Sequence, residues 1–108
     1  MAAVVAFALS QVGKRYVTGG EGRGGFDCSG LTKRAYARAG VQLPHSSGAQ
    51  AARARRIGRS QARPGDLVVG TGHVGIYMGR GMMVDAGNHR VGVVYRHLYS
   101  GLHLARLN

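Results

Sequence analysis

The sequence is poor in cysteine, in acidic residues and in long apolar stretches. One cysteine among 108 residues excludes an internal disulfide. No apolar run reaches the length of a membrane-spanning helix, so we expect no membrane span. The apolar stretch 2–9 has no basic segment before it and no cleavage-type sequence after it, so it does not resemble a signal peptide. This length suffices for one compact domain, which we assign to residues 1–108.

The scarcity of acids makes the chain strongly basic. Fifteen Lys and Arg face four acids, which gives a formal net charge of +11. Such a charge favours an anionic partner, either nucleic acid, an acidic membrane or an anionic cell-wall polymer, and it is equally typical of an arginine-rich proteome. The sequence has no aromatic-rich ribonucleoprotein strand, no paired Cys/His finger and no basic zipper. We therefore expect no specific nucleic-acid partner.

Helical patterns come first along the chain and strand patterns follow. Helices are predicted over 3–12, over 29–39, and from Ser46 or Ser47 to about Arg55. Short apolar runs separated by turn signals predict strands over 66–69, 73–78, 82–86, 91–95 and 102–107. This order predicts an α+β fold in which N-terminal helices pack on an antiparallel β-sheet.

The single cysteine, Cys28, lies where the glycine-rich loop 19–25 meets the second predicted helix. The unpaired amides and the positive dipole end of a helix N-terminus stabilise a thiolate. The same N–H groups can hold an oxyanion, and Asp27 or Ser29 can cap the helix. We interpret Cys28 as a nucleophile; the alternative is a small buried apolar residue.

A histidine and an acid lie on two adjacent predicted strands. Alternation places His73, Gly75 and Tyr77 on one face of their strand. If opposed positions sum to 158, His73 lies directly opposite Asp85 on the returning strand. A shift of two residues leaves the pair diagonal but near, whereas a shift of one separates the side chains onto opposite faces. In the favourable registers the carboxylate orients the imidazole, as the third member of a catalytic triad does.

These motifs resemble those of the NlpC-type cysteine peptidases of bacterial cell walls, which are papain-like. The resemblance covers nearly the whole chain. It rests on Tyr16 with Gly19-Gly20, and on the segments 26–31, 43–50, 64–68 and 73–79. It implies that Cys28 is the nucleophile, His73 the base and Asp85 the third polar residue of the site.

The resemblance also implies residues that line the substrate groove or support the oxyanion. These are Tyr16, Asp27, Ser29, His45 and Ser46. A packed aromatic is the alternative for Tyr16, and helix capping is the alternative for His45 and Ser46.

The reaction that the resemblance implies is hydrolysis of peptidoglycan stem peptides through an acyl-enzyme. The expected bond joins γ-D-glutamate to diaminopimelate or lysine. We expect a monomer that is secreted or associated with the cell wall, with its basic surface attracted to anionic wall polymers.

No cofactor or metal is expected. The five histidines at 45, 73, 89, 97 and 103 lack metal-ligand spacing, and the glycines at 20, 22 and 25 do not follow a strand as a dinucleotide motif requires. Two alternatives remain open: a non-catalytic peptidoglycan-binding module, and a basic nucleic-acid-binding domain.

Overall fold

The computed structural model describes residues 1–107 and confirms the predicted order of helices before strands. The helices are α1 (Ala2–Ser10), α2 (Cys28–Ala37) and α3 (Ser47–Ala52), with a short 3₁₀ helix η1 (Arg59–Gln61). The strands are β1 (Ala54–Ile57), β2 (Leu67–Gly70), β3 (His73–Gly79), β4 (Met82–Ala86), β5 (Val93–His97) and β6 (His103–Leu107). The bounds of the predicted elements differ from these by no more than three residues, and the strand predicted over 82–86 matches β4 at both ends.

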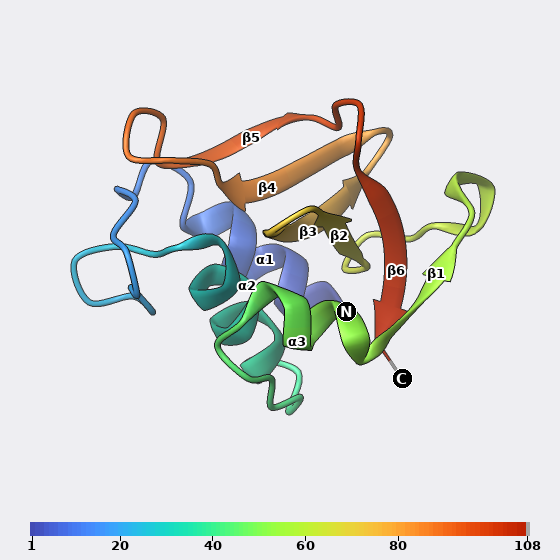
Figure 1. Cartoon of the computed structure of the whole chain (residues 1–108), viewed down its shortest axis with the longest axis horizontal. Helices are drawn as coiled ribbons and strands as arrows, with labels where there is room; N and C mark the ends of the chain where they lie inside the picture. Colours follow the sequence, from blue (N-terminus) through green and yellow to red (C-terminus); the bar gives the residue numbers. More distant parts are fainter. Residues whose placement is uncertain (108) are drawn as a thin grey trace.

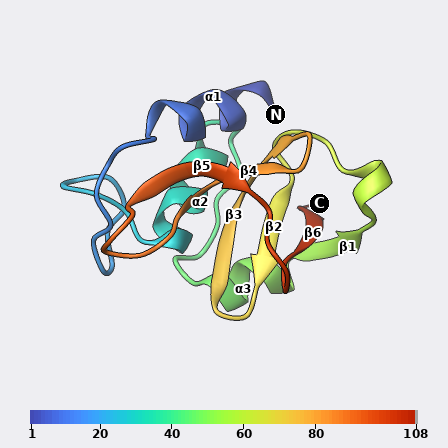
Figure 2. The same ribbon diagram turned by 90° about the horizontal axis from the view of Figure 1, so that it is seen from above.

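The strands form one antiparallel sheet in the order β1-β6-β2-β3-β4-β5. In Figure 1 the helices lie below β4 and β5, and α2 packs against β3. Figure 2 shows β3, β2 and β6 side by side from above. The predicted α+β fold, with N-terminal helices on an antiparallel sheet, is confirmed.

Side-chain caps fix where two of the helices begin. The Asp27 carboxylate accepts a 2.7 Å hydrogen bond from the backbone N–H of Gly30, which starts α2 at Cys28. The Ser46 hydroxyl accepts a 3.2 Å bond from the N–H of Ala49 and starts α3 in the same way. Asp27 and Ser46 are thus the caps among the alternatives that the sequence left open.

The predicted third helix is too long. It ends at Ala52, and Ala54–Ile57 forms the strand β1 instead of a further helical turn. This segment pairs with β6, where Ala54 lies opposite Leu107 and Ile57 opposite Leu104. A pairing partner about fifty residues away overrides local helix propensity here, so the pattern near Arg55 could not reveal the strand.

Of the registers of β3 and β4 that the sequence left open, the structure has the one shifted by two residues. Ile76 lies opposite Val84 and Tyr77 opposite Met83, so opposed positions sum to 160 rather than 158. The two-residue turn at Arg80 and Gly81, with φ values of 57° and 77°, pairs Gly79 with Met82, whose positions sum to 161. A β-bulge between Tyr77 and Gly79 then changes the sum to 160 along the rest of the strands. The shift is two residues, so His73 and Asp85 stay on one face, diagonal to each other.

The core lies on both faces of the sheet and follows the predicted alternation. Val74 and Ile76 of β3 pack with helix residues such as Leu31 and Tyr36. Tyr77 packs in a smaller cluster on the other face of the sheet. The helix-side core holds α2 firmly, and with it the position of Cys28 at the first residue of the helix.

Candidate active site

Cys28 is half-buried at the first residue of α2. The preceding loop is held against it, because the Asp27 N–H donates to the Gly20 carbonyl at 3.1 Å. Across residues 1–107, no acceptor bonds the backbone N–H groups of Cys28 and Ser29. These two amides at the positive end of α2 are available to an oxyanion beside the thiol.

The imidazole of His73 joins the thiol to a buried carboxylate. Its Nε2–H donates to Asp85 Oδ2 at 2.7 Å, which leaves Nδ1 as the ring nitrogen for Cys28. The hydrogen bond with Asp85, followed by the one with Cys28, raises the pKa of His73 to about 9. The ring is therefore an imidazolium at neutral pH, held between a carboxylate and the sulfur. The predicted proximity of His73 and Asp85 is confirmed, although the register differs.

A glycine makes the diagonal contact of His73 and Asp85 sterically feasible. By the register of β3 and β4, Gly75 lies opposite Asp85, and a Cβ atom on Gly75 would lie 3.0 Å from the Asp85 Cβ. This distance is tighter than nine in ten contacts of real Cβ atoms. The missing side chain at Gly75 therefore leaves the space through which the imidazole and the carboxylate meet.

Asp85 has a second partner, Arg96 of β5, that sequence reasoning missed. The Arg96 guanidinium donates to Oδ1 at 3.0 Å and to Oδ2 at 2.6 Å of this fully buried carboxylate. Burial alone raises the pKa of Asp85, but the bonds from His73 and Arg96 outweigh burial and hold that pKa below its usual range. The predicted strand ends at residue 95, whereas β5 extends to His97 and includes Arg96.

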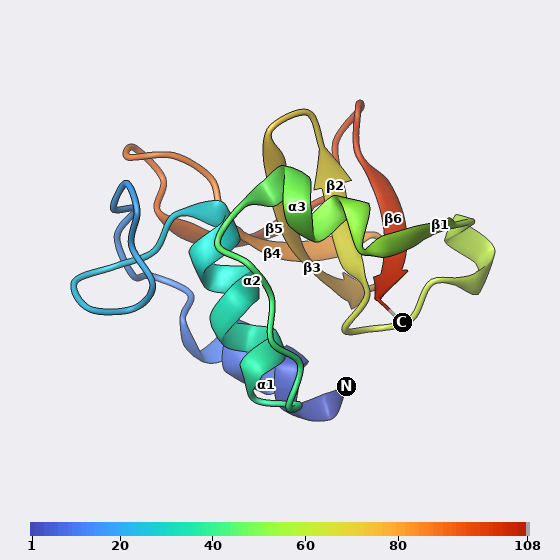
Figure 3. The same cartoon turned by 60° about the horizontal axis from the view of Figure 1, so that its bottom comes forward.

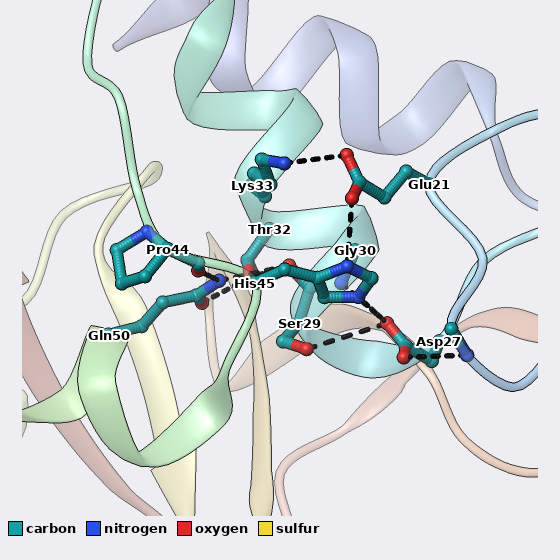
Figure 4. Close-up of polar contacts among 10 residues, drawn as sticks. Glu21, Asp27, Ser29, Gly30, Thr32, Lys33, Pro44, His45 and Gln50 are labelled. Atoms are coloured by element: carbon teal, nitrogen blue, oxygen red, sulfur yellow. Dashed lines mark hydrogen bonds and ion pairs between the residues drawn. The ribbon is translucent and has the colours of Figure 1, made fainter.

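A second polar network lies beside the first turn of α2 (Figure 4). His45 contacts Glu21 Oε2 at 2.8 Å through Nδ1 and Asp27 Oδ1 at 2.7 Å through Nε2. Donation to both carboxylates requires the imidazolium, and the bond to Asp27 is the main cause of the raised pKa of His45. Lys33 also bonds Glu21, at 2.8 Å. The network ties the glycine-rich loop to α2 and to the segment before α3.

The structure brings three of the five expected groove residues together: Asp27, Ser29 and His45. Ser29 is only 7% exposed, and its hydroxyl donates to Asp27 Oδ1 at 3.4 Å. Its backbone carbonyl accepts from the amide of Gln50, a buried side chain that sequence reasoning did not single out (Figure 4). Ser29 and Asp27 are therefore both engaged in hydrogen bonds within the protein, next to Cys28.

The other two expected groove residues have different surroundings. The ring of Tyr16 packs edge-on against His89 with centroids 4.7 Å apart. Burial raises the pKa of Tyr16, and the nearby charges of Cys28 and Asp27 raise it further. Tyr16 therefore lies near the thiol, whereas the hydroxyl of Ser46 is engaged in capping α3.

None of the helices within residues 1–107 is long and apolar enough to cross a membrane. In the same part of the chain, no three His, Cys, Asp or Glu side chains are grouped so that they could hold a metal ion.

The site thus has a cysteine at a helix N-terminus and a histidine that a buried aspartate holds. The family model described as the NlpC/P60 family matches residues 13–107. The chain belongs to the NlpC/P60 family. A relative from Listeria monocytogenes, described as probable endopeptidase p60, is 48% identical over 101 residues. The match covers 89% of this chain and 20% of that protein, so the chain spans about a fifth of the relative's length.

Solved NlpC/P60 structures have the same fold. The peptidoglycan hydrolase RipB from Mycobacterium tuberculosis superposes with a TM-score of 0.86 at 32% identity, over 99% of this chain and 64% of RipB. RipD from the same organism superposes with a TM-score of 0.82 at 35% identity, over 99% of this chain and 96% of RipD. RipD is described as a non-catalytic NlpC/p60 domain protein adapted to peptidoglycan binding. The fold is thus shared by hydrolases and by a binding protein.

Proposed function

We propose that this NlpC/P60 protein is a cysteine endopeptidase that hydrolyses peptidoglycan stem peptides, and that residues 1–108 act as one catalytic domain. The observation that carries the proposal is the 2.7 Å hydrogen bond from His73 to the buried Asp85, with Cys28 at the first residue of α2. The names of the p60 and RipB relatives support the substrate class.

In the proposed mechanism, the Cys28 thiolate attacks the carbonyl carbon of the scissile amide. The negative charge moves to the carbonyl oxygen, which the free N–H groups of Cys28 and Ser29 stabilise. The C–N bond then breaks while the His73 imidazolium gives its proton to the leaving amine, and a thioester remains. Water attacks the thioester with His73 as general base, and the thiolate returns. Asp85 keeps the imidazole oriented throughout.

The finer proposal concerns the bond that is cut. We propose the bond between γ-D-glutamate and the third stem residue, either diaminopimelate or lysine. Tyr16, Asp27, Ser29, His45 and Ser46 stand as proposed groove residues, with Tyr16 and the Asp27 network nearest the thiol. A formal charge of +11 supports attraction to anionic wall polymers and a location at or outside the cell wall.

Two alternatives differ in what they require of the site. A binding module such as RipD needs the groove but not a reactive thiol, whereas this chain keeps Cys28 at the start of α2 and holds His73 in hydrogen-bonded contact with Asp85. That contact favours catalysis over binding alone. Nucleic-acid binding draws support only from the basic charge.

The test is incubation of the protein with purified muropeptides, followed by mass spectrometry, beside the Cys28→Ala variant. Cleavage after γ-D-glutamate that the variant lacks is the expected result. Because Cys28 is the only thiol, its alkylation by iodoacetamide reports directly on the site. Cleavage by Cys28→Ala at the wild-type rate would contradict the assignment. Intact muropeptides together with an unreactive Cys28 would support the binding module.

A further inference from the structure

Five arginines gather in one short segment, 53–63, which contains no acidic residue, no lysine and no aromatic residue. The segment comprises β1, the 3₁₀ helix η1 and the turns beside them. Figure 3 shows it at the outer edge of the sheet, on the far side of β6 from β2. We call the five residues the arginine edge, and all of them are exposed: Arg53, Arg55, Arg56, Arg59 and Arg63.

Little in residues 1–107 compensates the charges of the arginine edge. The four acidic side chains pair with cations outside the segment: Lys33, His45, Arg96 and Arg106. Asp66 is the nearest acid along the chain, and Arg106 donates to both of its oxygens at 2.9 Å and 2.8 Å. Arg53 donates to the Gln42 carbonyl at 2.9 Å. Across the described residues, the other four guanidinium groups make no hydrogen bond or ion pair with the protein.

A histidine on the neighbouring strand responds to this surplus charge. His103 begins β6, which pairs with β1. Burial lowers the pKa of His103, and the nearby charge of Arg56 lowers it further. The positive potential of the arginine edge therefore extends to the next strand, where an anion bound at the edge would reduce it.

The arginine edge is separate from the thiol site. In the sheet, β1 lies three strand positions from β3, which begins at His73. Neighbouring strands are about 4.8 Å apart, so the two strands are about 14 Å apart across the sheet. A partner bound along β1 therefore leaves the groove at Cys28 open to substrate.

The side chains of the segment indicate which kind of anion fits it. A guanidinium can donate two parallel hydrogen bonds to one phosphate. Side chains of a strand alternate between its faces, so Arg55 and Arg56 flank the edge on opposite faces. An extended polymer with regularly spaced phosphates can therefore contact several of these arginines at once. Nucleic-acid strands also require aromatic side chains on which the bases stack, and 53–63 has none.

On the basis of the proposed function, we propose that the arginine edge is a docking surface for a phosphodiester polymer of the cell wall. The surface holds the protein on the wall while the groove at Cys28 receives the stem peptide. The attachment depends on the concentration of arginines at this edge and not on the net charge of the whole protein. Loss of the edge therefore weakens attachment and leaves the cleavage of small soluble substrates unchanged.

The test compares two triple variants that each lose three positive charges. The edge variant carries Arg55→Gln, Arg56→Gln and Arg59→Gln. The control variant carries three substitutions at exposed arginines outside the segment: Arg34→Gln, Arg80→Gln and Arg90→Gln. The probe is synthetic poly(glycerol phosphate), with binding measured at low salt.

We expect the edge variant to bind the probe about tenfold more weakly than the wild-type protein, and the control variant to stay within about twofold. Both variants are expected to keep the wild-type kcat/KM on a soluble muropeptide. Equal losses of binding in the two variants would overturn the docking surface, because net charge would then explain the attraction. An oligonucleotide with the same number of phosphates that binds more tightly than the probe would overturn the choice of a wall polymer.

The ring of His103 reports binding at the edge itself. Bound phosphates offset the charge of Arg56, so the probe should raise the pKa of His103, followed by NMR of the ring protons. His97, on β5 at the opposite edge of the sheet, is the control, and the probe should leave its ring signals in place. A His103 pKa that the probe leaves unchanged would contradict binding at this edge.

Binding by the Cys28→Ala variant separates this inference from the proposed function. Wild-type affinity of this variant for the probe, lost when the edge substitutions are added, supports the inference even where the wild-type protein cleaves no muropeptide. Equal affinity of the edge and control variants contradicts the inference even where muropeptides are cleaved.

Discussion

Arg96 donates to both oxygens of Asp85, at 3.0 Å and 2.6 Å, so the carboxylate that holds His73 is itself held from the next strand. A second arginine makes the same bidentate contact with an aspartate away from the thiol. Arg106 donates to the two oxygens of Asp66 at 2.9 Å and 2.8 Å. Both aspartates are buried, and both arginines are partly exposed. One of these two bidentate pairs lies at the site, and the other lies away from it.

This duplication gives a matched pair of variants for the role of Arg96. Arg96→Gln and Arg106→Gln each leave a buried carboxylate with fewer donors, so both are expected to lower the free energy of unfolding in urea. Only Arg96→Gln is expected to lower kcat/KM, by about tenfold or more, because Asp85 then loses its fixed orientation towards His73. Equal activity losses in the two variants would assign Arg96 a purely structural role.

The pH dependence of stability follows from the raised pKa of His73. Hydrogen bonds with Asp85 and then Cys28 raise this pKa to about 9, well above that of an unfolded histidine. The folded state therefore binds the proton more tightly. The stabilisation is complete below about pH 6.5 and is lost as the pH rises to about 9. The pKa of His45 is also raised, by Asp27 first, and acts in the same direction.

Urea unfolding across that pH range measures the effect. The free energy of unfolding is expected to fall from about pH 6.5 to about pH 9, and to fall less steeply in the His73→Gln variant. Stability that rises through this range would show that the proton is not held more tightly in the folded state.

Gly75 is expected to be intolerant of a side chain. A Cβ atom there would lie 3.0 Å from the Asp85 Cβ and 3.1 Å from the Val84 carbonyl oxygen. Gly75→Ala should cost about 1–3 kcal/mol of stability and displace Asp85 from His73, with a loss of kcat. Gly48→Ala is the control, since nothing lies within 4 Å of its added Cβ and alanine favours a helix. Wild-type kcat in Gly75→Ala would show that the contact of Asp85 with His73 survives the crowding.

His45 is expected to hold the glycine-rich loop in place. It bonds Glu21 in the loop and Asp27 at the start of α2. His45→Ala leaves these two carboxylates without their shared cation, so amide hydrogen exchange in residues 19–25 should accelerate several-fold. His97→Ala, at an exposed histidine of β5, is the control. Equal exchange in the two variants would contradict a holding role for His45.

Some features of the site were visible in the sequence because they are local. Cys28 follows Asp27, which caps α2. An acid just before a predicted helix can cap it independently of how the helix packs in the fold. Alternation along 73–78 placed His73 and Tyr77 on one face, because side chains of a strand alternate whatever its partner. The family resemblance of the motifs added the nucleophile and base, and the NlpC/P60 match agrees with that resemblance.

Other features depend on residues far apart in the chain. The pairing of β1 with β6 turned a predicted helix end into a strand. The turn at Arg80 and Gly81 and the β-bulge between Tyr77 and Gly79 together set the register of β3 and β4. The strand β5 then brings Arg96 to Asp85. The hydrophobic alternation along a strand carries no information on such pairings, because it is the same whichever strand lies beside it.

The sequence by itself therefore determined the order of helices and strands, the cap before Cys28 and the face that carries His73. Only the tertiary structure decided that Arg96 holds Asp85 and that His45 links Glu21 to Asp27. The physical reason is that capping and alternation arise from bonds between near neighbours. Ion pairs and pockets arise only when packing brings distant side chains within a few ångströms of one another.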